Sequence, residues 1–183
     1  VTGEPRSPLE LLQALAVQQS EIADGLRHVE IYTLRGLLTL LWHGPRDAED
    51  VVLTCGGAMG SLLGPAESLY HDLGTEFAAA GIGTVRVGYR KPGDLSRCVH
   101  DLAAPAARLT GSGARRFVTV GHSFGGAVAV QAGVVLGAHC RGVVTLATQS
   151  AGCEPAGDLG ETPLLLIHGT RDELLPPETS GVV

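Results

Sequence analysis

Residues 117–128 read FVTVGHSFGGAV, and this stretch decides the fold. Its first four residues are apolar or β-branched and predict a buried strand. Residues 127–136 are rich in Ala and Val and predict a helix. Only a tight glycine-rich turn joins the two, and it places the hydroxyl of Ser123 at the amino end of that helix.

Outward from this turn, the chain alternates between apolar strands and helices. The predicted strands are residues 51–55, 84–88, 116–120, 142–147 and 164–168, and the predicted helices are 65–80, 95–109 and 123–136. Near-continuous apolar strands are typical of a parallel sheet covered on both faces. Residues 29–34 and 37–42 meet at Arg35-Gly36 and predict an antiparallel hairpin at the sheet edge. The sequence therefore predicts an α/β fold with a mostly parallel central sheet.

The N-terminal segment has a different pattern. Ser7, Pro8 and Glu10 form a helix-start signal, and apolar residues follow at roughly helical spacing: Leu11, Leu12, Leu15, Ile22 and Leu26. We therefore expect residues 1–28 to form an accessory helix that covers the sheet edge or meets a partner. Residues 29–183 are expected to form one domain.

Composition limits the classes of function. A formal net charge of −6, with no basic run, argues against binding to nucleic acid or an anionic membrane. The cysteines match no zinc pattern and are too sparse for a disulfide scaffold, so we expect a cytoplasmic protein; they are Cys55, Cys98, Cys140 and Cys153. Neither a secretory signal nor an apolar run of membrane-spanning length is recognised.

The segment Gly121-His122-Ser123-Phe124-Gly125, between a strand and a helix, resembles the nucleophile elbow of the α/β-hydrolase superfamily. In that resemblance Ser123 is the nucleophile, and His122 is a packing residue whose side chain points elsewhere. The alternative is a glycine-rich turn with no catalytic role. The strand before and the helix after favour the elbow.

The resemblance also implies an oxyanion hole. One donor is the backbone N–H of Phe124, directly after the nucleophile. The other is expected in the loop 55–61, which is similar to the His-Gly-Gly loops of the superfamily; we assign it to Gly57, with Ala58 as the near alternative. Cys55 is interpreted as a buried residue at a strand end, not as a second nucleophile.

Residues 163–176 read PLLLIHGTRDELLP and resemble the acid-bearing loop of dienelactone-hydrolase-like enzymes. The resemblance makes Asp172 the residue that orients a catalytic histidine. The alternative is an Asp that only forms a turn after the strand. Asp158 and Glu154 are weaker candidates for the acid.

The superfamily order is Ser, Asp, His, but no histidine follows Asp172. All seven precede it: His28, His43, His71, His100, His122, His139 and His168. His168 is interpreted as structural. The chain is therefore expected to be a truncated hydrolase that lacks its C-terminal strand, histidine and helix, or else a naturally short, impaired member.

The first hypothesis is a serine hydrolase that cleaves carboxylic esters, thioesters or lactones through an acyl-enzyme on Ser123. It needs a small-molecule acyl substrate and implies no metal or organic cofactor. Arg90 or Lys91 could meet an anionic substrate, and Gln149 and Ser150 could line the pocket. The rivals are an interaction module on the same fold and, third, nucleotide binding, against which the absence of a phosphate-loop motif counts. The acyl group, the leaving group and the oligomeric state stay open.

Overall fold

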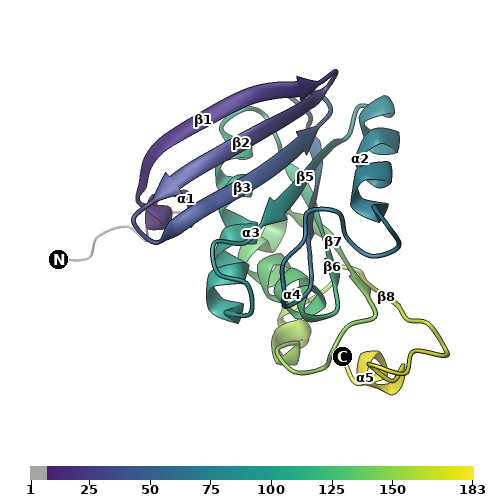
Figure 1. The fold of residues 1–183 in the computed structure, drawn as a ribbon. Coiled ribbons are helices and arrows are strands. Elements are labelled where there is room, and N and C mark those ends of the chain that lie inside the picture. Colours follow the sequence, from purple (N-terminus) through teal and green to yellow (C-terminus); the bar gives the residue numbers. More distant parts are fainter. Residues whose placement is uncertain (1–7) are drawn as a thin grey trace.

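A computed structural model describes residues 8–183 and contains one eight-stranded sheet with helices on both faces (Figure 1). The strand order is β1-β2-β3-β5-β4-β6-β7-β8. The first three strands and the β3–β5 pair are antiparallel, whereas all later pairs are parallel. The strands are β1 (Ala14–Ala23), β2 (Leu26–Thr33), β3 (Gly36–His43), β4 (Asp50–Cys55), β5 (Gly83–Gly88), β6 (Arg116–His122), β7 (Cys140–Leu146) and β8 (Leu164–Ile167). This architecture confirms the predicted fold class.

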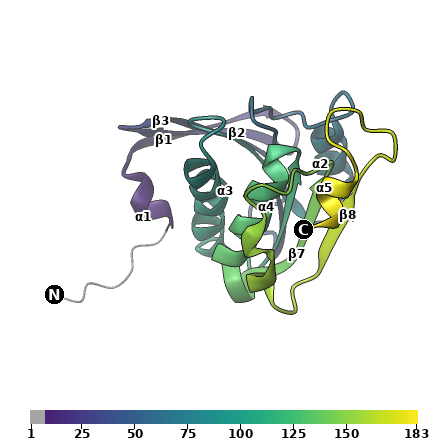
Figure 2. The ribbon, with the colours of Figure 1, turned by 90° about the horizontal axis from the view of Figure 1, so that it is seen from below.

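The helices lie in two layers around the sheet. Seen from below, α3 and α4 pack side by side on one face, with α1 next to α3, while α2 covers the other face (Figure 2). The α-helices are α1 (Pro8–Leu12), α2 (Leu69–Ala79), α3 (Leu95–Thr110), α4 (Phe124–Leu136) and α5 (Glu178–Gly181); the 3₁₀ helices are η1 (Gly137–His139) and η2 (Glu154–Leu159). Asp94 begins α3, because its carboxylate accepts the N–H of Arg97 at 3.3 Å.

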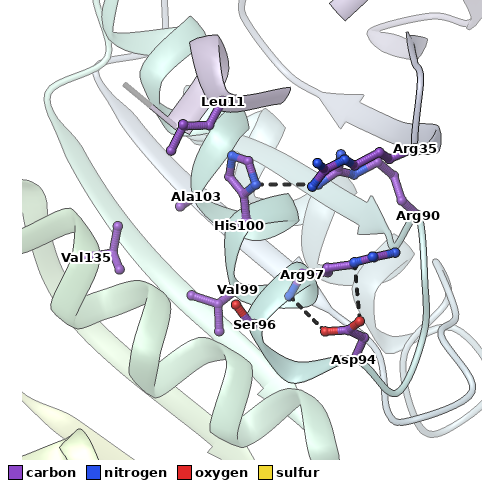
Figure 3. Close-up of a pocket in the computed structure, with 10 residues that line it drawn as sticks. All are labelled: Leu11, Arg35, Arg90, Asp94, Ser96, Arg97, Val99, His100, Ala103 and Val135. Atoms are coloured by element: carbon purple, nitrogen blue, oxygen red, sulfur yellow. Dashed lines mark hydrogen bonds and ion pairs between the residues drawn. The ribbon is translucent and has the colours of Figure 1, made fainter. Parts of the chain in front are cut away.

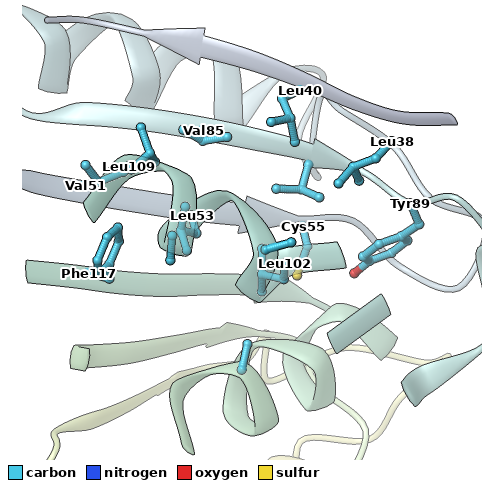
Figure 4. Close-up of a cluster of buried hydrophobic side chains, with 14 of the residues drawn as sticks. Leu38, Leu40, Val51, Leu53, Cys55, Val85, Tyr89, Leu102, Leu109 and Phe117 are labelled. Atoms are coloured by element: carbon cyan, nitrogen blue, oxygen red, sulfur yellow. The ribbon is translucent and has the colours of Figure 1, made fainter. Parts of the chain in front are cut away.

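The core follows from the alternation of side chains along the buried strands. In β4, Val51 and Leu53 point into the cluster between the sheet and α3 (Figure 4). Val52 points the other way and packs with Tyr70 of α2. The central strands are thus buried on both faces, which explains their continuous apolar sequence.

The predicted N-terminal helix is wrong for most of its length. Only α1 is helical; Gln13 has a φ of 52°, and β1 then pairs with β2 along its whole length. The two strands turn at Asp24-Gly25, with Gly25 at a φ of 66°. An Asp-Gly pair is a strong hairpin signal, and here it outweighs a weak helical spacing. Ser7, the predicted cap, lies outside the described residues.

β1 and β8 form the two edges of the sheet and are the least covered strands. Every residue of β1 is exposed. In β8, Leu165 and Ile167 are 54% and 49% exposed on one face. Full burial of both faces, expected from the apolar sequence, is therefore wrong for β8.

Candidate active site

Ser123 lies at the junction of β6 and α4, on a backbone that most residues avoid. Its φ is 56° and its ψ is −123°, a region in which an L-residue is strained. Its amide donates to the carbonyl of Leu146 at 2.9 Å, and its carbonyl accepts the N–H of Gly126 at 2.9 Å. The turn is thus held from both sides while the serine remains partly exposed. This is the geometry that a nucleophile elbow requires.

Two glycines make the turn possible. A Cβ on Gly121 would lie 1.8 Å from the carbonyl oxygen of Gly125. A Cβ on Gly125 would lie 2.4 Å from the carbonyl oxygen of Gly56. Both obstacles are backbone atoms, so no side-chain movement would relieve them. The glycines of the motif are therefore needed for close backbone approach.

A cavity of ≈ 290 Å³ opens beside Ser123, walled largely by the glycine-rich loop after β4. Gly57 and Ala58 both line it, as does the exposed side chain of Met59. A Cβ on Gly57 would lie 3.7 Å from the Cβ of Ser123, so this part of the loop is next to the serine. The N–H of Phe124 is in the first turn of α4, where amides have no acceptor within the helix. The structure thus brings both proposed oxyanion donors close to Ser123.

Two buried tyrosines hold the loop in place. Tyr70 donates its hydroxyl to the carbonyl of Cys55 at 2.8 Å, and Tyr89 donates to the carbonyl of Gly56 at 3.0 Å. Burial raises the pKa of both phenols, so they remain neutral donors. The sequence analysis did not predict this role, because the acceptor of a buried tyrosine hydroxyl is set by packing between segments that are distant in the sequence.

Cys55 is fully buried under the same loop. Its thiol lies 3.4 Å from the carbonyl oxygen of Gly125, and burial raises its pKa to about 12. A thiol in that state is not a nucleophile at neutral pH. This confirms the interpretation of Cys55 as a buried residue at a strand end.

Asp172 lies in the loop after β8. Its carboxylate accepts the N–H groups of Leu174 and Leu175, both at 2.9 Å, and these bonds lower its pKa. Its other oxygen is 3.4 Å from Nε2 of His168. These contacts fit a turn-forming Asp and leave the carboxylate ionised at neutral pH. Its role as the catalytic acid stays a prediction.

His168 is held at both ring nitrogens. Nδ1 is 2.6 Å from the hydroxyl of Ser180, and Nε2 is 2.7 Å from the carbonyl of Leu175. A ring with both nitrogens engaged in this way connects β8 to the C-terminal loop and α5. The contacts agree with a structural role for His168.

His122 differs from the expectation. Its Nδ1 would lie 3.9 Å from a Cβ on Gly57, and the residue lines the Ser123 cavity. Burial lowers its pKa, and the charge of Asp172 offsets part of that shift. The ring is therefore neutral at pH 7. The prediction that its side chain points away from the site is wrong.

The other candidate substrate contacts lie elsewhere. Arg90 makes a buried ion pair with Asp101 at 2.6 Å. Ser150 lines a separate surface cavity, where Glu154 also lies. The remaining candidates are bound locally or exposed: Lys91 pairs with Asp94, Gln149 bonds the carbonyl of Ala151, and Asp158 is on the surface of η2.

No helix among the described residues is both long and apolar enough to cross a membrane. The same part of the chain holds no group of three or more His, Cys, Asp or Glu side chains placed to bind a metal.

Comparison with solved structures identifies the fold. A dienelactone hydrolase from Anabaena variabilis superposes with a TM-score of 0.68 at 19% identity, over 91% of this chain and 79% of that one. Est1E from Butyrivibrio proteoclasticus matches with a TM-score of 0.68 at 14% identity, over 85% and 82%. XC6422 from Xanthomonas campestris, an α/β serine hydrolase without a lid, matches with a TM-score of 0.62 at 16% identity, over 89% and 79%. No protein-family model matches the chain, and no curated protein does either. The chain therefore has the α/β-hydrolase fold.

Proposed function

We propose that this protein is a serine hydrolase of small carboxylic esters, thioesters or lactones. The observation that carries the proposal is the strained Ser123 at the amino end of α4, directly beside Gly57. The solved structures of the same fold include a dienelactone hydrolase and a serine hydrolase.

In the proposed reaction, the hydroxyl oxygen of Ser123 attacks the acyl carbon and loses its proton to a base. The carbonyl oxygen becomes an oxyanion that accepts the N–H groups of Phe124 and Gly57. Collapse of this intermediate expels the alcohol, thiol or ring oxygen, which takes up the proton. Water then attacks the acyl-enzyme, releases the carboxylate and restores the serine.

The proposed reaction needs a histidine as its base, and in the α/β-hydrolase order that histidine follows the acid in the sequence. Asp172 is ionised and would orient a histidine, but no histidine follows it in the sequence. The proposal therefore takes the histidine from outside these residues. Without this histidine, the oxyanion donors alone would support only a low residual activity.

The cytoplasm is the proposed location. All four cysteines are free and buried in the structure. Free thiols are typical of a reducing compartment.

A fluorophosphonate probe tests the proposal, since it reacts only with an activated serine. Labelling of the chain, extended by any natural C-terminal sequence, should occur in the wild type and be lost in Ser123→Ala. Ser150→Ala is the matched control and should label normally. Absence of labelling in the extended chain would overturn the proposal and favour the alternative, a non-catalytic interaction module.

A further inference from the structure

A second cavity lies on the outer face of the helical layer, away from Ser123. Its volume is ≈ 510 Å³, within the range of about 300–1,000 Å³ that is typical of small-molecule sites. The lining residues come from α1, α3, α4, the β2–β3 turn and the segment after β5 (Figure 3); they are Leu11, Arg35, Arg90, Asp94, Ser96, Arg97, Val99, His100, Ala103 and Val135. We call this the α3 groove.

The α3 groove is distinct from the Ser123 cavity. Within the described residues the two share no lining residue. Ser123 precedes α4, whereas Val135, at the apolar side of the groove, is near the end of α4, so about 18 Å of helix separates these two residues. A ligand in the groove would leave the serine accessible.

Polar and apolar groups are segregated in the α3 groove. Arg35, Arg90 and Arg97 lie toward one side in Figure 3, while Leu11, Ala103 and Val135 lie toward the other. Leu11 is 51% exposed and Val135 is 55% exposed. Two large apolar side chains are thus left in water at one end of a cationic groove.

The cations of the groove are not all neutralised. Arg90 is paired with the buried carboxylate of Asp101. Arg97 is paired with Asp94, which Lys91 also contacts. Arg35, on the exposed β2–β3 turn, has no ion pair within residues 8–183.

We propose that the α3 groove binds an aliphatic monocarboxylate of medium chain length. The guanidinium of Arg35 is the primary partner of the carboxylate, because a guanidinium fork matches both oxygens. Ser96 and Arg97 also line the groove and add polar groups to it. The tail covers Leu11 and Val135, and removal of their surface from water favours binding. This inference goes beyond the proposed function and does not depend on it.

Isothermal titration calorimetry of the whole chain with sodium octanoate tests the proposal. We expect saturable binding that is roughly tenfold weaker or worse in Arg35→Gln, the loss of one charge-assisted contact. Val135→Asp, which places a negative charge at the apolar end, should weaken it similarly. Arg35 and Val135 are both exposed, so neither change should unfold the protein.

The controls separate the groove from other binding sites. Arg141→Gln removes another exposed arginine and should leave the affinity unchanged. Ser123→Ala should also leave it unchanged, whatever the protein hydrolyses. The proposal is overturned by absence of saturable binding, by equal affinity for octanol, by an unaffected Arg35→Gln, or by lost binding in Ser123→Ala.

Discussion

The strained backbone at Ser123 predicts that replacing this residue by glycine stabilises the protein while it removes the proposed nucleophile. A φ of 56° with a ψ of −123° costs a non-glycine residue about 1–3 kcal/mol. Glycine adopts this conformation without that strain, but it loses about 0.5–1 kcal/mol more in chain entropy on folding. The difference leaves a gain of about 1 kcal/mol.

Ser123→Ala is the proper reference, because it removes the hydroxyl but keeps the Cβ that causes the strain. Ser123→Gly should exceed Ser123→Ala by about 1 kcal/mol in free energy of unfolding, or roughly 2–4 °C in Tm for a chain of this size. Urea unfolding followed by far-UV circular dichroism measures the difference.

At an ordinary position inside a helix, replacement by glycine is expected to destabilise the protein. Ala132 lies inside α4 and is fully buried, so Ala132→Gly should lose about 1 kcal/mol or more. A Ser123→Gly variant no more stable than Ser123→Ala would refute the strain at the turn and, with it, the main structural support for a nucleophile elbow.

Two further predictions concern close packing and protonation. Gly121→Ala should give insoluble or unfolded protein, because its Cβ would lie 1.8 Å from the carbonyl oxygen of Gly125. The control is Gly157→Ala, which should have an unchanged Tm because no atom lies within 4 Å of the new Cβ. A soluble, folded Gly121→Ala variant would contradict this geometry. Burial lowers the pKa of His43 from 6.5 to about 4 in the folded protein. Between these two pH values the histidine is protonated in the unfolded chain but not in the folded one, so a falling pH favours unfolding. About 3 kcal/mol of stability should be lost between pH 6.5 and 4. His43→Gln should flatten this dependence in urea titrations, whereas the exposed His139→Gln should not; equal slopes in wild type and His43→Gln would show that the ring is not the cause.

The sequence predicts the parallel part of the sheet well, for a physical reason. Strands such as β4 and β6 are buried on both faces, so their apolar residues run together and stand out between helices. The turn at Ser123 is also predictable from the sequence, because a Cβ on Gly121 would collide with the backbone only four residues further along the chain.

Features that depend on distant partners were not predictable. β1 is exposed throughout, so no burial constrains its sequence to alternate, and its few apolar residues imitate a helix. Arg90 looks like a solvated loop charge until α3 brings Asp101 to within 2.6 Å of it. The contacts of Tyr70 and Tyr89 with the loop carbonyls likewise arise only when the layers pack together.

The cation above the indole of Trp42 has a spectroscopic consequence. Trp42 is the chain's one tryptophan, it is 8% exposed, and the guanidinium carbon of Arg27 lies 4.1 Å from the ring centroid. Trp42 belongs to β3, which pairs with β2 on one side and, through β5, connects the antiparallel strands β1 to β3 with the parallel part of the sheet. Tryptophan fluorescence therefore reports on the environment of β3 alone. If the emission changes before the helical circular-dichroism signal is lost, strands β1 to β3 separate from β5 before the rest of the fold unfolds.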